Sequence, residues 1–479
     1  MSLSARDIRA RLDHPVIDAD GHCIEFVPLV RDLMVEDAGE SVARRFDAVL
    51  AGSAAVRPVD DVTRRAVGYS RTGWWALPAV NTLDRATAML PKLLHDRLDD
   101  IGIDLAFLYP TLGLMPMALD DDEMRCALAR ACNRYYTECY GPYRDRLRPV
   151  AIIPTYTPDE AIAELEFAHG VLGMRTFLFG GLVLRPTPGA EGLRAARWVD
   201  GLGLDSVHDY SPLWQRCVEL GVTPTFHSTG IGFGSRTSPR NYVANHIGNF
   251  AAGNEAIARS LLFGGMATQF PQLRAAFLEG GVSWAAQLYA DLCSHFAKRN
   301  RDALGHYDAR QLDRAALSRL VHDHGEPAVV ARADRLSEGL SFLSDPDEPH
   351  ENLDEWASSG VASTGDLARV FADQWFFGCE ADDPMNALAF DRHAHPGGIS
   401  LRAMFASDIG HWDVPDFLGV LPEAWELVED GRVDEAQFRA FTCDNVIALL
   451  GPQAFAGTVV EEYAHQGDKS PGAATETGG

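Results

Sequence analysis

The sequence has few basic residues for its length. It carries 42 Lys and Arg against 68 Asp and Glu, which gives a formal net charge of −26 over 479 residues. Because nucleic acids and anionic membrane surfaces are bound by basic faces, this balance argues against both kinds of partner. An anionic substrate would have to meet a local cluster of arginines or lysines.

Several short motifs are also absent from the sequence. The eight cysteines form no C-x-x-C pair, so we expect reduced thiols. No G-x-G-x-x-G, Walker or G-x-S-x-G motif occurs, which argues against a nucleotide-binding fold and against a serine hydrolase. No apolar run has the length of a signal peptide or a membrane span, so we expect a cytoplasmic protein.

The sequence does contain a repeated alternation of short apolar runs and longer helical patterns. Eight such runs end in polar residues or glycine: residues 16–22, 102–111, 147–155, 181–186, 222–230, 274–282, 375–380 and 401–409. This alternation predicts the α/β class and a parallel (β/α)₈ TIM barrel. An open doubly wound sheet gives a similar pattern, but the residues at the strand ends favour the barrel.

We expect one domain over residues 1–465, with two long inserts at about 35–82 and 284–374. On a barrel, segments that follow strands lie on the face where active sites are built. The inserts are therefore expected to form a lid and a substrate pocket. Residues 466–479 are small and polar and are expected to form a disordered tail.

The strongest local signal is the sequence DADGHCIE, residues 18–25, at the end of the first predicted strand. Asp20 and His22 are two residues apart, so they project from the same side of a strand. Glu25 can fold back over the same point. A carboxylate together with an imidazole suits iron, manganese or zinc. The alternative is that these are ordinary turn and loop residues.

Other predicted strands also end in ionisable residues. His227 closes the fifth run, Glu279 the sixth, Glu380 the seventh and Asp408 the eighth, with His411 three residues further on. Buried carboxylates and imidazoles are costly unless they are paired or bind a metal. Taken singly, each has an ordinary explanation as a helix cap or a core hydrogen bond. Several converging on one barrel mouth are best explained by a cation.

Counting ligands suggests more than one metal. Four residues would satisfy one metal and leave positions for water or substrate: Asp20, His22, His227 and Asp408. Glu25 and Glu279 then have nothing to neutralise them, which suggests a second metal. Alternatively, one of these extra carboxylates is a general base.

Three weaker candidates follow the fifth run. His246 is a candidate ligand or substrate contact, with a plain surface histidine as the alternative. Arg236 and Arg240 are candidate contacts for an anionic group above the barrel.

These motifs resemble those of the amidohydrolase superfamily, in particular its branch of metal-dependent enzymes related to aminocarboxymuconate-semialdehyde decarboxylase. The resemblance covers roughly residues 15–446 and is carried by VIDADGH, by the histidine after the fifth run and by FASDIGHWD. It implies that Asp20 and His22 occupy the H-x-H pair of the first strand. His227 matches the histidine of strand five, and Asp408 matches the aspartate of strand eight.

Two positions depart from that pattern. Asp20 replaces the first histidine, and Glu279, before Gly280 and Gly281, replaces a catalytic histidine. The missing imidazole argues against ordinary hydrolysis or decarboxylation, and the added carboxylates favour two irons over one zinc. With stretches such as NTLDRATAMLPKLL and GIDLAFLYPTLG, the chain resembles a smaller group, the TIM-barrel nonheme diiron monooxygenases of diterpenoid pathways.

Three functional hypotheses follow. The resemblance implies a diiron monooxygenase that uses O₂, an external electron donor or reductase, and an apolar, coenzyme A-linked acyl substrate of diterpenoid type. Its two Fe ions would be held by Asp20, His22, Glu25, His227, Glu279 and Asp408. The second hypothesis is a mononuclear Zn or Mn hydrolase or decarboxylase with Glu279 or Asp408 as the base. The third is a barrel without chemistry that serves as a binding or scaffold subunit. Assembly into a homo-oligomer stays open.

Overall fold

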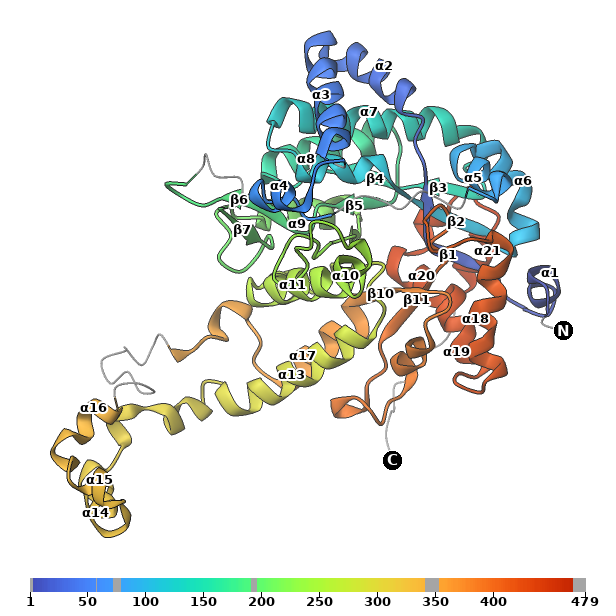
Figure 1. The fold of residues 1–479 in the computed structure, drawn as a ribbon. Coiled ribbons are helices and arrows are strands. Elements are labelled where there is room, and N and C mark those ends of the chain that lie inside the picture. Colours follow the sequence, from blue (N-terminus) through green and yellow to red (C-terminus); the bar gives the residue numbers. More distant parts are fainter. Residues whose placement is uncertain (1–2, 57, 72–78, 191–195, 341–352, 468–479) are drawn as a thin grey trace, which may run out of the picture.

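The computed structural model describes residues 3–56, 58–71, 79–190, 196–340 and 353–467. At its centre lies a set of parallel strands surrounded by helices (Figure 1). The strands are β1 (Ile17–Cys23), β2 (Leu105–Pro110), β3 (Leu147–Pro149), β4 (Ala151–Ile153), β5 (Phe177–Phe179), β8 (Pro224–Phe226), β9 (Ala275–Phe277), β10 (Trp375–Glu380) and β11 (Arg402–Ala406).

These strands form two ladders, β1-β2-β3 and β11-β10-β9-β8-β5-β4, in which every pairing is parallel. Because β3 and β4 are separated only by Val150, they are two halves of one strand position. The ladders therefore supply the eight positions of a (β/α)₈ barrel, and the predicted fold is confirmed.

The strands are buried on both faces, as a barrel requires. Side chains facing inward form one apolar cluster that includes Leu105, Phe107, Leu178, Phe376 and Met404. The opposite faces of the strands join a second, larger cluster with the surrounding helices. This two-sided burial explains why the strands are continuous apolar runs in the sequence rather than alternating ones.

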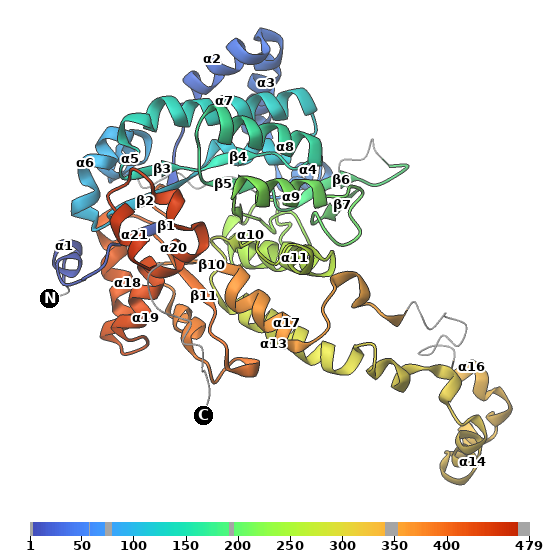
Figure 2. The ribbon, with the colours of Figure 1, turned by 180° about the vertical axis from the view of Figure 1, so that it is seen from behind.

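Helices surround the barrel on all sides (Figures 1 and 2). They are α1 (Ala5–Arg9), α5 (Thr82–Met89), α6 (Pro91–Ile101), α7 (Asp122–Tyr140), α8 (Pro158–Glu166), α9 (Ser211–Leu220), α10 (Tyr242–His246), α11 (Asn249–Phe263), α12 (Met266–Gln269), α13 (Ser283–Arg299), α17 (Thr364–Arg369), α18 (Val420–Glu429), α19 (Glu435–Arg439), α20 (Asn445–Leu450) and α21 (Glu461–Gly467). Within the described ranges, no helix has both the length and the apolar composition needed to cross a bilayer.

The fourth strand was predicted in the wrong place. Residues 181–186 do not enter the barrel; β6 (Val183–Pro186) pairs antiparallel with β7 (Arg197–Asp200) in a separate hairpin. The barrel position belongs to β5, whose three residues are all buried. In β6, Leu184 is 37% exposed, so this strand keeps one face toward solvent. Both segments are short and apolar, and only their burial separates them.

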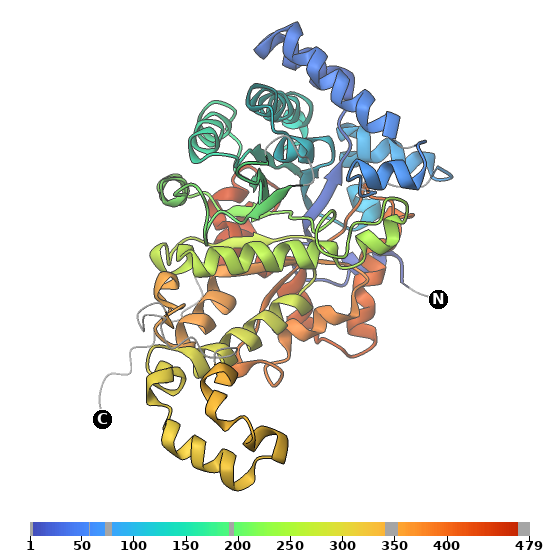
Figure 3. The same ribbon diagram turned by 60° about the vertical axis from the view of Figure 1, so that its left-hand side comes forward.

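The second insert differs from the expected lid. The first contains α2 (Val27–Ala38), α3 (Glu40–Val56) and α4 (Asp61–Ala66), with α2 and α3 packed against α7. In the second, α14 (Arg314–His324), α15 (Pro327–Val330) and α16 (Leu336–Leu340) project away from the barrel (Figures 1 and 3). None of the side chains in these three helices is buried. The projecting helices therefore do not cover the barrel. The expected tail lies outside the described residues from position 468 onward, and α21 includes Gln466 and Gly467.

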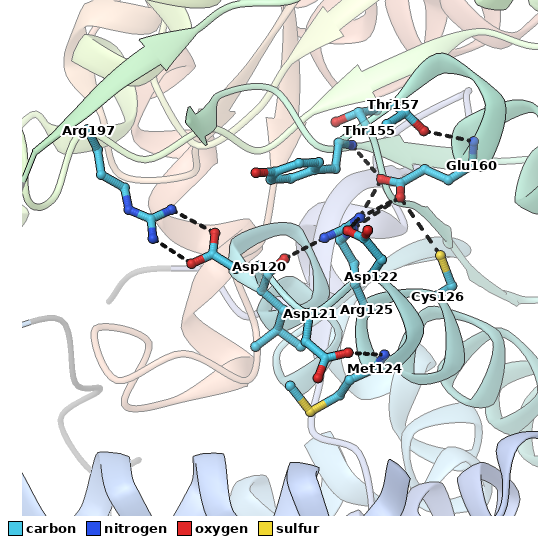
Figure 4. A network of polar contacts seen from close by, with 12 residues as sticks. Asp120, Asp121, Asp122, Met124, Arg125, Cys126, Thr155, Thr157, Glu160 and Arg197 are labelled. Atoms are coloured by element: carbon cyan, nitrogen blue, oxygen red, sulfur yellow. Dashed lines mark hydrogen bonds and ion pairs between the residues drawn. The ribbon is translucent and has the colours of Figure 1, made fainter. Parts of the chain in front are cut away.

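A buried ion-pair network fixes the segment that follows β2 (Figure 4). Arg125 of α7 is 1% exposed and donates to the Glu160 carboxylate of α8, with 2.7 Å between Nη2 and Oε2. It also donates to Asp122 and to the Leu119 carbonyl. Because a buried guanidinium is costly unless its donors are bound, this network holds the end of the 3₁₀ helix η1 (Leu112–Ala118) in place.

Candidate metal centre

Six ionisable side chains meet at the carboxyl ends of the barrel strands, and all six are buried: Asp20, His22, His227, Glu279, Asp408 and His411. They come from β1 and from the segments that directly follow β8, β9 and β11. The carboxyl ends of parallel barrel strands lie on one face, so residues far apart in sequence are brought together here. The five strand-end residues predicted as ligands, all except Glu25, are therefore neighbours, and His411 joins them.

Local backbone irregularities direct these side chains inward. The register between β1 and β2 shifts between Asp18 and Gly21, directly around Asp20. Glu279 and Asp408 adopt left-handed backbone conformations, with φ of 55° and 51°. Non-glycine residues rarely occupy this region, and such strain collects where the surrounding structure and function require it. Both residues turn the chain sharply at a strand end.

The six residues form two clusters that share His22. In the first, ligand atoms of Asp20, His22 and His227 all lie within 4.8 Å of one another. In the second, the same holds for His22, Glu279, Asp408 and His411. The Nε2 atom of His22 lies 3.6 Å from Asp20 Oδ1 and 3.3 Å from Asp408 Oδ1. His22 thus stands between two sets of ligands.

Glu279 reaches toward both clusters with different oxygens. Its Oε2 contacts Nε2 of His227, and its Oε1 lies 3.6 Å from Nδ1 of His411. His411, predicted only as a further candidate, also places Nδ1 2.6 Å from Asp408 Oδ1. The D-x-x-H spacing in FASDIGHWD is the sequence signal for this pairing, because one tight turn brings the two side chains together.

The residues present fit a bound cation. Asp20 is almost fully buried, and neither of its carboxylate oxygens accepts a hydrogen bond from the described residues. Burial raises the pKa of Asp20 to about 8, with nearby Glu279 adding to the effect. Burial also lowers the pKa of His22 well below its usual value, which leaves a neutral imidazole suited to bind a metal. A cation would supply the missing partner of the Asp20 carboxylate.

The charges around Glu279 are strongly coupled. Burial opposes its ionisation, but His227 and His411 together hold the pKa of Glu279 well below its usual value. The Glu279 charge in turn overcomes burial and raises the pKa of both histidines. Burial and the same Glu279 charge raise the pKa of Asp408 well above its usual value. In the absence of a cation, this cluster retains protons that bound metal would displace.

This protonation predicts a pH-dependent metal affinity. A metal held by Asp20 would bind the ionised form of its carboxylate, whose pKa is raised to about 8, so metal-free protein would have to release a proton to bind Mn²⁺ at neutral pH. Affinity should therefore rise with pH and level off above about pH 8. Calorimetry in buffers of different ionisation enthalpy measures the released protons. Asp20→Asn should release fewer protons, whereas equal release by both proteins would show that Asp20 is not a ligand.

The structure does not bring Glu25 to the centre. Its Oε2 accepts a hydrogen bond from the Leu112 amide at 2.7 Å, and its Oε1 accepts from the Gly113 amide at 3.0 Å and from the Tyr136 hydroxyl at 2.6 Å. Neither ligand cluster includes it. Glu25 does fold back, as its position in the sequence suggested, but toward η1, where it fixes the start of that helix.

His246 and Glu380 lie outside the two clusters. His246 is half-buried, and its ring packs edge-on against Phe250 and Trp412, at 5.6 Å from each. Phe250 in turn packs against the His227 ring at 4.9 Å. His246 therefore lies one ring away from His227, and its contact with a substrate stays a prediction. Burial and nearby Glu279 raise the pKa of Glu380 to about 8.

The two candidate arginines have other partners. Arg236 donates through Nη2 to the carbonyls of Ile247 and Gly248, at 3.1 and 3.0 Å. Arg240 pairs with Asp61 at 3.3 Å, and its side chain is 75% exposed. Arg236 thus holds the loop between α10 and α11, and Arg240 links the segment before α10 to α4. Their expected role as contacts for an anion stays a prediction.

One protein-family model matches the chain, and several solved structures resemble it. The family model described as Amidohydrolase matches residues 30–338, a range that includes His227 and Glu279 but not the ligands on β1 or after β11. No curated protein matches the chain. Solved structures that resemble it include an amidohydrolase from Mycobacterium avium subsp. paratuberculosis, with 18% identity, a TM-score of 0.43, and coverage of 77% of this chain and 76% of that one.

Two decarboxylases also resemble the chain. For 5-carboxyvanillate decarboxylase from Novosphingobium aromaticivorans with bound manganese, identity is 12% and the TM-score 0.49, over 91% of this chain and 97% of that one. For dihydroxybenzoic acid decarboxylase from Polaromonas, also with manganese, the values are 14% and 0.48, over 92% and 98%. Since the family model matches more than half of the sequence, the chain belongs to the amidohydrolase family.

Proposed function

We propose that this amidohydrolase-family chain is a nonheme monooxygenase whose centre holds two iron ions. The position of Glu279 carries the proposal, because its two carboxylate oxygens face different histidines, His227 and His411. A carboxylate held in this way can join two cations. A neutral imidazole, which the family resemblance leads one to expect at this position, offers a single lone pair.

The donor set supports two cations of this kind. Three carboxylates and three imidazoles provide mixed oxygen and nitrogen ligands, which suit iron or manganese. Two divalent cations a few ångströms apart repel each other strongly unless carboxylates neutralise them. When bound, the iron pair would supply the redox chemistry that activates O₂. Insertion of one oxygen atom and reduction of the other to water needs two electrons and two protons. An external donor or reductase would provide the electrons, and the protons would come from solvent.

The residues around the ligands suggest which part of the substrate lies near the centre. Phe250, His246 and Trp412 form an aromatic side next to His227. Such a surface suits an apolar acyl group and keeps water away from it. We assign the substrate to the coenzyme A-linked acyl class. Because Arg236 donates hydrogen bonds to backbone carbonyls, we do not propose that it contacts a phosphate of coenzyme A.

A one-cation hydrolase or decarboxylase is the second candidate. Asp20, His22 and His227 alone form a complete three-ligand set, and family membership favours this chemistry. In that case a single zinc or manganese would act as a Lewis acid. Glu279 would then take a proton from water rather than bind metal.

The origin of the added oxygen separates the two candidates. Iron-loaded protein with a chemical reductant would be incubated with a panel of apolar acyl-coenzyme A esters under ¹⁸O-labelled O₂. The monooxygenase should produce a hydroxylated acyl chain that carries the label and should be inactive without O₂. Turnover that continues without O₂, with oxygen taken from water or with release of CO₂, would replace the proposal with the second candidate.

A further inference from the structure

The barrel closes between β1 and β11 without a continuous ladder. Among the described residues, these two strands belong to different ladders. Two backbone hydrogen bonds join them at the level of the metal centre: the Asp408 amide donates to the Asp20 carbonyl at 3.1 Å, and the His22 amide donates to the Ile409 carbonyl at 2.9 Å. The seam of the barrel therefore runs through the candidate ligands themselves.

Asp18 supplies a further link across this seam. Its side chain is fully buried, and Oδ2 accepts a hydrogen bond from the Ser407 hydroxyl at 2.6 Å. Oδ1 accepts from the Ser407 amide at 2.9 Å and from the Asp20 amide at 3.2 Å. One carboxylate thus holds the backbone of a ligand on β1 and of the residue just before Asp408.

Ser407 extends the restraint to both sides of Asp408. Its hydroxyl donates to Asp18 and accepts from the Ile409 amide at 3.2 Å. The intervening Asp408 has a φ of 51°, a conformation that a non-glycine residue keeps only when its surroundings hold it. The serine side chain therefore contributes to holding Asp408 in its strained conformation.

Two glycines make room for this close approach. A Cβ atom at Gly21 would lie 2.5 Å from Oδ2 of Asp18, and one at Gly410 would lie 2.9 Å from the His22 carbonyl oxygen. Gly410 also has a φ of 94°, which other residues rarely adopt. A larger residue at Gly21 would displace the Asp18 carboxylate, and one at Gly410 would push the segment after β11 away from β1.

We infer that Asp18, acting through Ser407, is a positioning residue that sets the separation between the ligands on β1 and those after β11. Asp20 and His22 lie on one side of the seam, and Asp408 and His411 on the other. The inference rests on the cation centre proposed above, but not on the oxygenase chemistry. Groups that orient metal ligands commonly change metal affinity by about 10- to 100-fold when they are removed.

The test compares metal binding by three variants of the whole chain. Asp18→Asn keeps the size of the side chain but replaces one acceptor oxygen with a donor, and Ser407→Ala removes the hydroxyl while leaving Asp18 in place. Asp200→Asn is the matched control, because Asp200 is equally buried and hydrogen-bonded, but to Arg185 in the separate hairpin. Mn²⁺ alone is titrated into metal-free protein, and electron paramagnetic resonance reports whether two bound Mn²⁺ ions are magnetically coupled.

Asp18→Asn should bind Mn²⁺ about 10- to 100-fold more weakly and lose the coupled signal. Ser407→Ala should change both in the same direction, and the double variant should be no weaker than Asp18→Asn, because the two residues act as one unit. Asp200→Asn should keep wild-type affinity and coupling even if it unfolds at a lower temperature.

Wild-type affinity and coupling in Asp18→Asn, or equal losses in Asp18→Asn and Asp200→Asn, would overturn the inference. If Asp18→Asn does not fold, the Mn²⁺ affinity and the coupled signal of Ser407→Ala provide the test. If wild-type protein binds only one Mn²⁺, the two-iron function fails, while the affinity of the variants still tests the role of Asp18.

Discussion

Glu279→Ala should lose one of two bound irons and essentially all O₂-dependent turnover. Glu279 contacts His227 with one oxygen and approaches His411 with the other, so in the proposed two-iron centre its removal would delete a carboxylate placed to join the two metals. The remaining two carboxylates would neutralise a second divalent cation poorly. Metal analysis of the purified variant and measurement of O₂ consumption check both parts of this prediction.

Two comparisons make the Glu279 result specific. Glu25→Gln alters a buried carboxylate that binds η1 rather than the centre, so its iron content should match that of the wild type. Glu279→His should not restore oxygenation, because it exchanges an anionic bridging ligand for a neutral one. If Glu279 is only a general base, Glu279→Ala will keep its full iron content and slow turnover by about 10²- to 10⁴-fold.

His22→Ala should lose nearly all bound metal. His22 belongs to both ligand clusters, and it lies between Asp20 and Asp408 at 3.6 and 3.3 Å. His227→Ala is the matched variant, because His227 belongs to the first cluster only, and it should retain part of the metal. Equilibrium metal binding followed by elemental analysis distinguishes the two variants.

The fold of His22→Ala should remain largely intact. The apolar clusters inside and outside the barrel do not depend on the centre, and removing a neutral imidazole leaves no new buried charge. Circular dichroism and the thermal unfolding of the metal-free variant provide the check. Global unfolding of His22→Ala would show that the site is structural. Equal metal loss in His22→Ala and His227→Ala would show that His22 does not belong to both clusters.

The barrel and most of the centre could be predicted from the sequence because their signals are local. A buried strand in a parallel barrel is a continuous apolar run, and an ionisable residue directly after it stands out, as Glu279 does after AAFL. Parallel strands place all such residues on one face. The sequence alone could therefore predict that five candidate ligands at the ends of four strands lie close together.

Features that depend on which strands pair, or on which residues are hydrogen-bonded to each other, could not be predicted in this way. Residues 181–186 are as apolar as a barrel strand, and only the three-dimensional structure shows that they form a hairpin while β5 enters the barrel. The position of Glu25 shortly after His22 predicts a ligand, but the backbone amides of Leu112 and Gly113 are its partners, 87 and 88 residues away. Asp18 begins the same motif, and its partner Ser407 lies 389 residues further on.

The number and identity of the metals test the central claim most directly. Protein produced in iron-containing medium and purified without added metal would be analysed by inductively coupled plasma mass spectrometry against an accurate protein concentration. We expect close to two irons per chain, with little zinc or manganese. A single zinc or manganese per chain would contradict the two-iron centre and assign the barrel to one-metal hydrolysis or decarboxylation.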